Sequence, residues 1–182
     1  YPKATTITRW GARSDKVLSL TFDGGPDPRY TPKILDILAE KGVKATFFIV
    51  GSAGALSTDL LERIYREGHE IGNHTYTHTD LEKMTTSQLR LELMLTQRLI
   101  QSRLGVSTLL FRPPFGVDDQ AVSPTGFERL RAVQQLGYRI VGSEIDSNDW
   151  GYEQDQVPPS PDEIVETVLE QARNGDGHVV LM

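Results

Sequence analysis

Short apolar runs alternate with longer amphipathic segments along the whole chain. The short runs are rich in β-branched and aromatic residues, as buried strands are. Between them apolar positions recur with the period of an α-helix, as they do from Leu60 to Tyr65 before Gly68. The predicted strands are 17–22, 45–50, 70–74, 109–112, 138–145 and 178–182. The predicted helices are 32–41, 58–67, 87–104, 127–136 and 161–173.

Capping signals support two of these helix starts. Thr85 and Gln88 have capping-box spacing, and 160–163 combines a capping box with proline at the first helical position. Strands separated by single helices imply a parallel sheet, and six such units without repeats or linkers predict one barrel-like α/β domain. Functional side chains in such folds gather in the loops at the C-terminal ends of the strands.

Composition narrows the classes of function. The 182 residues are 38% hydrophobic, which suffices for one domain with a core. The net charge of −6 without a Lys/Arg cluster argues against nucleic acid as a partner. No apolar run approaches the roughly 18 residues of a membrane span, so no membrane contact by this segment is expected. The chain has no cysteine, which leaves histidines and carboxylates as the candidate metal ligands.

The loop after the first predicted strand holds Asp23 in a turn rich in glycine and proline. A carboxylate at this strand end can act as a base or a ligand. A plain Asp-Gly turn is the alternative. A phosphatase nucleophile is a further alternative, weakened because position 25 is glycine where a second aspartate is usual.

Three later strand ends also carry candidate residues. His74 and His78 are four residues apart, a spacing that places both imidazoles on one side of a turn, as in zinc sites, although a chance pair stays open. Arg112 ends a buried-looking strand and needs a carboxylate partner there, in a catalytic or a purely structural ion pair. Asp149 and Trp150 follow the fifth strand, where a surface Asx turn is the alternative.

Together these segments resemble the motif series of the polysaccharide deacetylase family, carbohydrate esterase family 4, whose NodB-type domain is a distorted (β/α) barrel. The resemblance runs from about Val17 to Met182 and includes 44–48 of the second strand. It implies an N-terminal extension or linker at 1–15 and a deacetylase domain at 16–182. Residues 28–33 are similar to deacetylase domains joined to bacterial glycosyltransferases. An extracellular or cell-surface location is implied as well.

The resemblance implies a role for each residue near the first strands. Asp23 is the general base that takes a proton from the attacking water, and Arg112 pairs with it and orients it. The backbone N–H of Phe115 stabilises the oxyanion of the tetrahedral intermediate. His74 and His78 hold a divalent metal, with zinc expected first and cobalt or nickel as alternatives.

The same resemblance assigns the residues at the end of the chain. Trp150 and Leu181 wall the acetyl pocket, and Asp149 orients the histidine that serves as general acid. The implied reaction is removal of N-acetyl groups from an N-acetylglucosamine polysaccharide: peptidoglycan, a chitin-type oligomer or an exopolysaccharide. A catalytically inactive carbohydrate-binding domain and another metal-dependent amide hydrolase on the same scaffold are the alternatives.

Two departures from the family pattern predict impaired activity. Gly24 stands where the family has the aspartate that completes the metal triad, and the Gly25-Pro26 turn points the nearby Asp27 elsewhere. The sequence ends at Met182 in the last predicted strand, just before the position of the general-acid histidine, so the barrel is expected to be incomplete at this end. His178 is no substitute, because it begins that strand.

Overall fold

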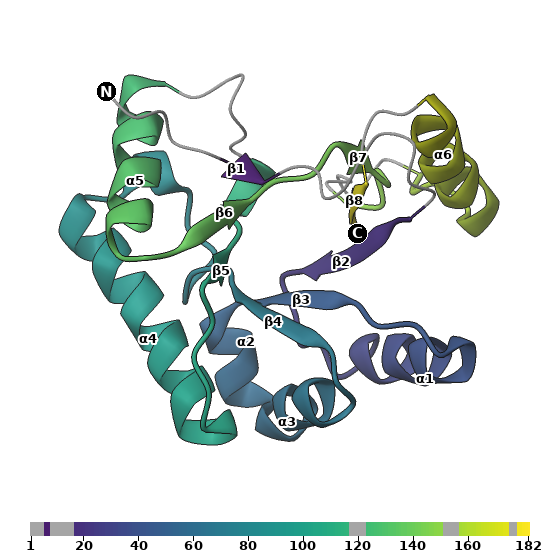
Figure 1. The fold of residues 1–182 in the computed structure, drawn as a ribbon, viewed down its shortest axis with the longest axis horizontal. Helices are drawn as coiled ribbons and strands as arrows, with labels where there is room; N and C mark the ends of the chain where they lie inside the picture. Colours follow the sequence, from purple (N-terminus) through teal and green to yellow (C-terminus); the bar gives the residue numbers. More distant parts are fainter. Residues whose placement is uncertain (1–5, 8–16, 117–122, 151–156, 175–177) are drawn as a thin grey trace.

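A curved sheet of eight strands forms the centre of the molecule (Figure 1). The computed structural model describes residues 6–7, 17–116, 123–150, 157–174 and 178–182. The strands are β1 (Thr6–Ile7), β2 (Ser19–Asp23), β3 (Thr46–Ile49), β4 (Glu70–Asn73), β5 (Leu110–Phe111), β6 (Arg139–Val141), β7 (Ile145–Asp146) and β8 (Val179–Leu181). Their order is β1-β6-β5-β4-β3-β2-β8-β7, and each pair is parallel. The prediction of a distorted parallel α/β barrel is confirmed.

Helices cover the outer side of the curved sheet (Figure 1). They are α1 (Thr31–Lys41), α2 (Gly51–Leu56), α3 (Thr58–Arg66), α4 (Thr86–Leu104), α5 (Pro124–Gln135) and α6 (Pro161–Asn174), with short 3₁₀ helices η1 (Leu81–Lys83) and η2 (Pro114–Gly116). The capping box of Thr85 and Gln88 forms as expected, and Gly105 ends α4 in the left-handed region with φ 70°. None of the described helices has the combination of length and apolar character that a bilayer crossing requires.

The predicted strand 138–145 is wrong in one respect, because this segment forms two strands at different places in the sheet. β6 lies between β1 and β5, whereas β7 pairs with β8 at the opposite end of the strand order. Only residues 142–144 connect them, so Val141 and Ile145 are at most about 14 Å apart. The two ends of the sheet therefore curl toward each other, although β1 and β7 do not pair among the described residues.

The sequence pattern also misses α2. Its sequence contains Gly51 and Gly54, which weaken the helical signal. Both glycines are buried, and a Cβ on Gly51 would collide with the side chains of Thr96 and Tyr76. Close packing of α2 against α4 and the loop after β4 thus explains why position 51 is glycine.

Apolar side chains fill both sides of the sheet. Two clusters lie between the sheet and the helices, one including Leu35, Phe47 and Ile64 and the other including Leu93 and Phe111. A smaller cluster joins strands far apart in the chain: its members are Phe48, Val141 and Val179, with Leu110 packed against them.

Candidate active site

A largely buried ion pair joins the ends of β2 and β5. Asp23 is the last residue of β2, and its Oδ1 accepts a hydrogen bond from Nη1 of Arg112 at 2.9 Å. Arg112 follows β5 directly and is only 3% exposed. The structure thus supplies the carboxylate that an arginine at a buried strand end requires.

The guanidinium of Arg112 has further partners. It donates to the hydroxyl oxygen of Thr21 at 2.6 Å and to the carbonyl oxygens of Val141 at 3.2 Å and Gly142 at 2.9 Å. Its Cζ lies 4.4 Å from the ring centroid of Phe48, which adds a cation–π contact. With four acceptors and a ring against it, this side chain is fixed in one orientation.

The environment of Asp23 shifts the pKa of its carboxyl group toward neutral pH. Burial raises the pKa of Asp23 to about 6, while the charge and hydrogen bond of Arg112 oppose the rise. A carboxylate with this pKa is ionised at pH 7 and can still accept a proton there. These are the properties of a general base.

His74 is held as a neutral imidazole with one free nitrogen. Its Nδ1 lies 2.8 Å from the carbonyl oxygen of Arg112, so Nδ1–H donates and Nε2 keeps its lone pair. Burial lowers the pKa of His74 to about 3. Nε2 lies 3.8 Å from Oδ2 of Asp23, which places the free nitrogen beside the carboxylate. A carbonyl that orients a histidine in this way is common behind metal ligands.

His78 lies against His74, as the four-residue spacing predicts. The two ring centroids are 4.9 Å apart in an edge-to-face arrangement. The ring of Phe115 covers the other side of His78, with centroids also 4.9 Å apart. Phe115 has φ 64° and is 62% exposed, so it forms the outer wall of this site. The structure thus brings Asp23, His74, His78, Arg112 and Phe115 together.

The predicted residues after β7 have partners within their own loop. Oδ1 of Asp149 accepts a hydrogen bond from the hydroxyl of Ser147, and Nε1 of Trp150 donates to Oδ1 of Asp146 at 3.0 Å. The Trp150 side chain is 55% exposed. Leu181 of β8 is level with Asp146 in the neighbouring strand. The acetyl-pocket roles of Trp150 and Leu181 and the orienting role of Asp149 stay predictions.

The donor set fits a divalent cation only in part. His74 and His78 offer two imidazoles, but the described residues contain no group of three or more histidine and acidic side chains able to hold a metal. Gly24, which offers no side-chain donor, has φ 85° and open space around a Cβ position. Arg29 binds Asp27 through both carboxylate oxygens and lowers its pKa to about 2. Asp27 is thus already bound by another residue.

Two residues at the site were absent from the sequence-based set. Thr21 is two positions before Asp23, and the two-residue period of a strand was a signal that both share one face. Glu92, on α4, hydrogen-bonds the loop that carries His78. No spacing rule connects a helix residue to loop residues 15 and 16 positions earlier, so only the fold reveals this contact.

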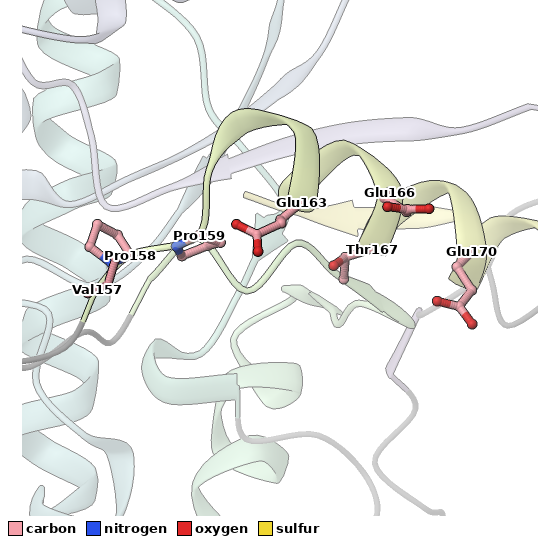
Figure 2. A pocket seen from close by; sticks show the side chains of 7 residues that line it. All are labelled: Val157, Pro158, Pro159, Glu163, Glu166, Thr167 and Glu170. Carbon is pink, nitrogen blue, oxygen red and sulfur yellow. The ribbon is translucent and has the colours of Figure 1, made fainter.

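A cavity of about 650 Å³ lies elsewhere, between α6 and the segment before it (Figure 2). Glu163, Glu166 and Glu170 extend from one side of α6 toward it, and Val157 and Pro158 border it (Figure 2). None of the predicted site residues lines this cavity.

Comparisons with known proteins agree on one family. The family model described as polysaccharide deacetylase matches residues 11–141. The peptidoglycan-N-acetylglucosamine deacetylase PgdA of Listeria monocytogenes is 32% identical over 171 residues, which cover 94% of this chain and 33% of the relative. The chain therefore spans about a third of this relative's length.

Solved structures show the same likeness. A Bc1960 peptidoglycan N-acetylglucosamine deacetylase superposes with TM-score 0.82 at 32% identity, covering 99% of this chain and 76% of that one. A family 4 pseudoenzyme from Bacillus anthracis has TM-score 0.82 and 26% identity, with 100% and 59% covered. A family 4 acetyl xylan esterase from Clostridium thermocellum, solved with a cobalt ion, has TM-score 0.73 and 31% identity, with 92% and 73% covered.

Proposed function

Because the chain belongs to the polysaccharide deacetylase family, we propose that its site hydrolyses N-acetyl groups of N-acetylglucosamine units in a polysaccharide. Peptidoglycan is the first candidate substrate, since similar proteins are named peptidoglycan deacetylases, and chitin-type oligomers are the second, since another is named a chitooligosaccharide deacetylase. The observation that carries the proposal is the buried pair of Asp23 and Arg112 beside the free nitrogen of His74.

Amide hydrolysis needs a base for the attacking water, a donor for the oxyanion and an acid that protonates the departing amine, the role predicted above for the histidine that Asp149 orients. Asp23 takes the proton of the water, because its carboxylate is ionised at neutral pH and close to the imidazoles. Arg112 holds that carboxylate in one position and keeps it charged. The backbone N–H of Phe115, in the loop that covers His78, is the proposed oxyanion donor.

A divalent metal held by His74 and His78, with zinc proposed first, would supply the activation of water at this place. The tautomer of His74 favours such binding, because Nδ1–H is already used by the carbonyl of Arg112. Gly24 removes the third ligand that the family pattern contains, so we propose weak metal binding and impaired activity in this chain.

The test is acetate release by the unchanged chain and its Gly24→Asp variant, each with added Zn²⁺ and with a chelator. Aspartate tolerates the left-handed conformation better than most residues, and no neighbour obstructs its Cβ, so the variant should fold with a small loss of stability. We expect Gly24→Asp to bind Zn²⁺ about 10- to 100-fold more tightly. We also expect it to release more acetate from peptidoglycan or chitin oligomers than the unchanged chain does.

Gly24→Asn is the matched control, because it has the same shape without the charge. Asp23→Asn in the Gly24→Asp background should abolish the gain in acetate release. Absence of acetate release from all acetylated glycans by Gly24→Asp with bound Zn²⁺ in the full-length protein would reject the hydrolase proposal.

A second candidate function is glycan binding without catalysis. Gly24 favours it, as does the likeness to the Bacillus anthracis pseudoenzyme. It predicts that the unchanged chain sediments with insoluble peptidoglycan and that Gly24→Asp changes neither binding nor acetate release. An extracellular or cell-surface location and attachment to a glycosyltransferase stay predictions.

A further inference from the structure

The loop between β4 and the 3₁₀ helix η1, residues 74–80, has an unusual backbone. Thr75 has φ 64° and His78 has φ 57°, both in the left-handed region. For the β-branched Thr75 this conformation is strongly disfavoured, so surrounding contacts must hold it. Because His78 belongs to this loop, the same contacts determine where its imidazole lies.

Helix α2 and the residues beside it hold the carbonyl groups of this loop. The N–H of Gly51 donates to the carbonyl oxygen of Thr75, and the N–H of Ser52 donates to that of Tyr76, both at 2.9 Å. The hydroxyl of Thr96, on α4, donates to the same Thr75 oxygen at 2.8 Å. These contacts leave the N–H groups on the other side of the loop to find acceptors.

Glu92 provides those acceptors. Its Oε2 accepts from the N–H of Tyr76 at 2.8 Å and from the N–H of Thr77 at 2.7 Å, and its Oε1 accepts from the hydroxyl of Thr77 at 3.1 Å. Glu92 is one turn before Thr96 on α4, so one face of this helix contacts both ends of the turn. Hydrogen bonds to a carboxylate are among the stronger ones in proteins.

We propose that Glu92 is a positioning residue, whose carboxylate fixes the loop backbone and thereby presents the imidazole of His78 beside that of His74. The inference rests on the proposed function, in which His74 and His78 together hold a metal. Packing of α4 itself does not need Glu92, because Leu89, Leu93 and Ile100 of this helix are buried in the core. The hydrogen bonds of the Glu92 carboxylate therefore serve the loop and not the packing of α4.

The test compares Glu92→Ala with Glu92→Gln in metal-free protein. We expect Glu92→Ala to accelerate amide hydrogen exchange of Tyr76 and Thr77 by about tenfold or more, because both lose a charged acceptor. It should also remove the nuclear Overhauser contacts between the rings of His74 and His78. Glu92→Gln should keep these contacts and show intermediate exchange, because its amide oxygen can accept both N–H groups while its NH₂ donates to the Thr77 hydroxyl.

Glu62→Ala is the control, since it removes the same charge from α3, and it should leave both measurements unchanged. If Glu92→Ala does not fold, Glu92→Asp replaces it, because the charge is kept and the reach is shortened. In the Gly24→Asp background, Glu92→Ala should also weaken Zn²⁺ binding about 10- to 100-fold, with Glu92→Gln restoring most of it.

Unchanged exchange at Tyr76 and Thr77 together with intact His74–His78 contacts in Glu92→Ala would overturn the inference. These measurements need neither metal nor substrate. A failure of acetate release therefore rejects the proposed function alone, whereas a failure here rejects the role of Glu92 alone.

Discussion

Two buried groups at the site respond to pH in opposite directions. His74 has a folded-state pKa of about 3, below its ordinary value, so the unfolded chain binds a proton first as the pH falls. Its contribution to stability is present above about pH 6.5 and is lost toward pH 3. Asp23, with its pKa raised to about 6, binds a proton first in the folded state and partly offsets that loss below pH 6. The larger shift of His74 should dominate.

We therefore predict that His74→Asn makes the stability of the metal-free protein less sensitive to acid. Asparagine can keep a donor near the carbonyl of Arg112 but does not titrate. Urea unfolding between about pH 7 and pH 4 should show a smaller loss of unfolding free energy in the variant than in the unchanged chain. Equal slopes in both proteins would show that His74 stays protonatable in the folded state.

At the scale of elements, the packing of α2 against the loop after β4 carries a stability prediction. Gly51→Ala should destabilise the protein by about 1–3 kcal/mol, because its Cβ would collide with Thr96 and Tyr76. Its N–H also binds the carbonyl of Thr75, so the shift should reach His78. Urea unfolding gives the stability and the His78 ring resonances give the displacement. Ser52→Ala, one position later, should change neither by a comparable amount.

The sequence predicted most of the elements because their signals are local. Periodicity, capping boxes and glycine ends gave α1, α3, α4 and α6 to within a residue or two. The division of 138–145 into β6 and β7 was missed, because the polar break at 142–144 does not reveal that the second half pairs at the opposite end of the strand order. In the same way, α2 was missed because its glycines are required by close packing against residues that are distant in sequence.

The same distinction applies to the site. His74 and His78 are near each other in sequence, so their shared side was predictable from spacing. The need of Arg112 for a carboxylate followed from its position after a buried strand. Its bonds to Thr21, Val141 and Gly142, and the support from Glu92, depend on how distant segments meet. No local pattern encodes those contacts.

For the whole molecule, Arg112 connects segments that lie far apart in the chain. It joins β2, β5 and the end of β6 through one guanidinium. We predict that Arg112→Met lowers the unfolding free energy by about 3–5 kcal/mol, because Asp23 loses its partner and several buried acceptors lose their donor. Urea unfolding measures this, with the exposed Arg66→Met as the control for a lost surface charge. A loss below about 1 kcal/mol would contradict a central structural role.

The burial of the Arg112 ion pair has a consequence for evolution. A lineage that no longer needs hydrolysis can change the residue at position 24 without harming the core, because that position faces open space. It cannot discard Asp23 or Arg112 as freely, since each would leave the other buried and unmatched. Selection for folding alone would preserve them. Across descendants of such a scaffold, the retention of Asp23 and Arg112 is therefore poor evidence of catalytic activity. The residue at position 24, which the core does not constrain, is the more informative marker of that activity.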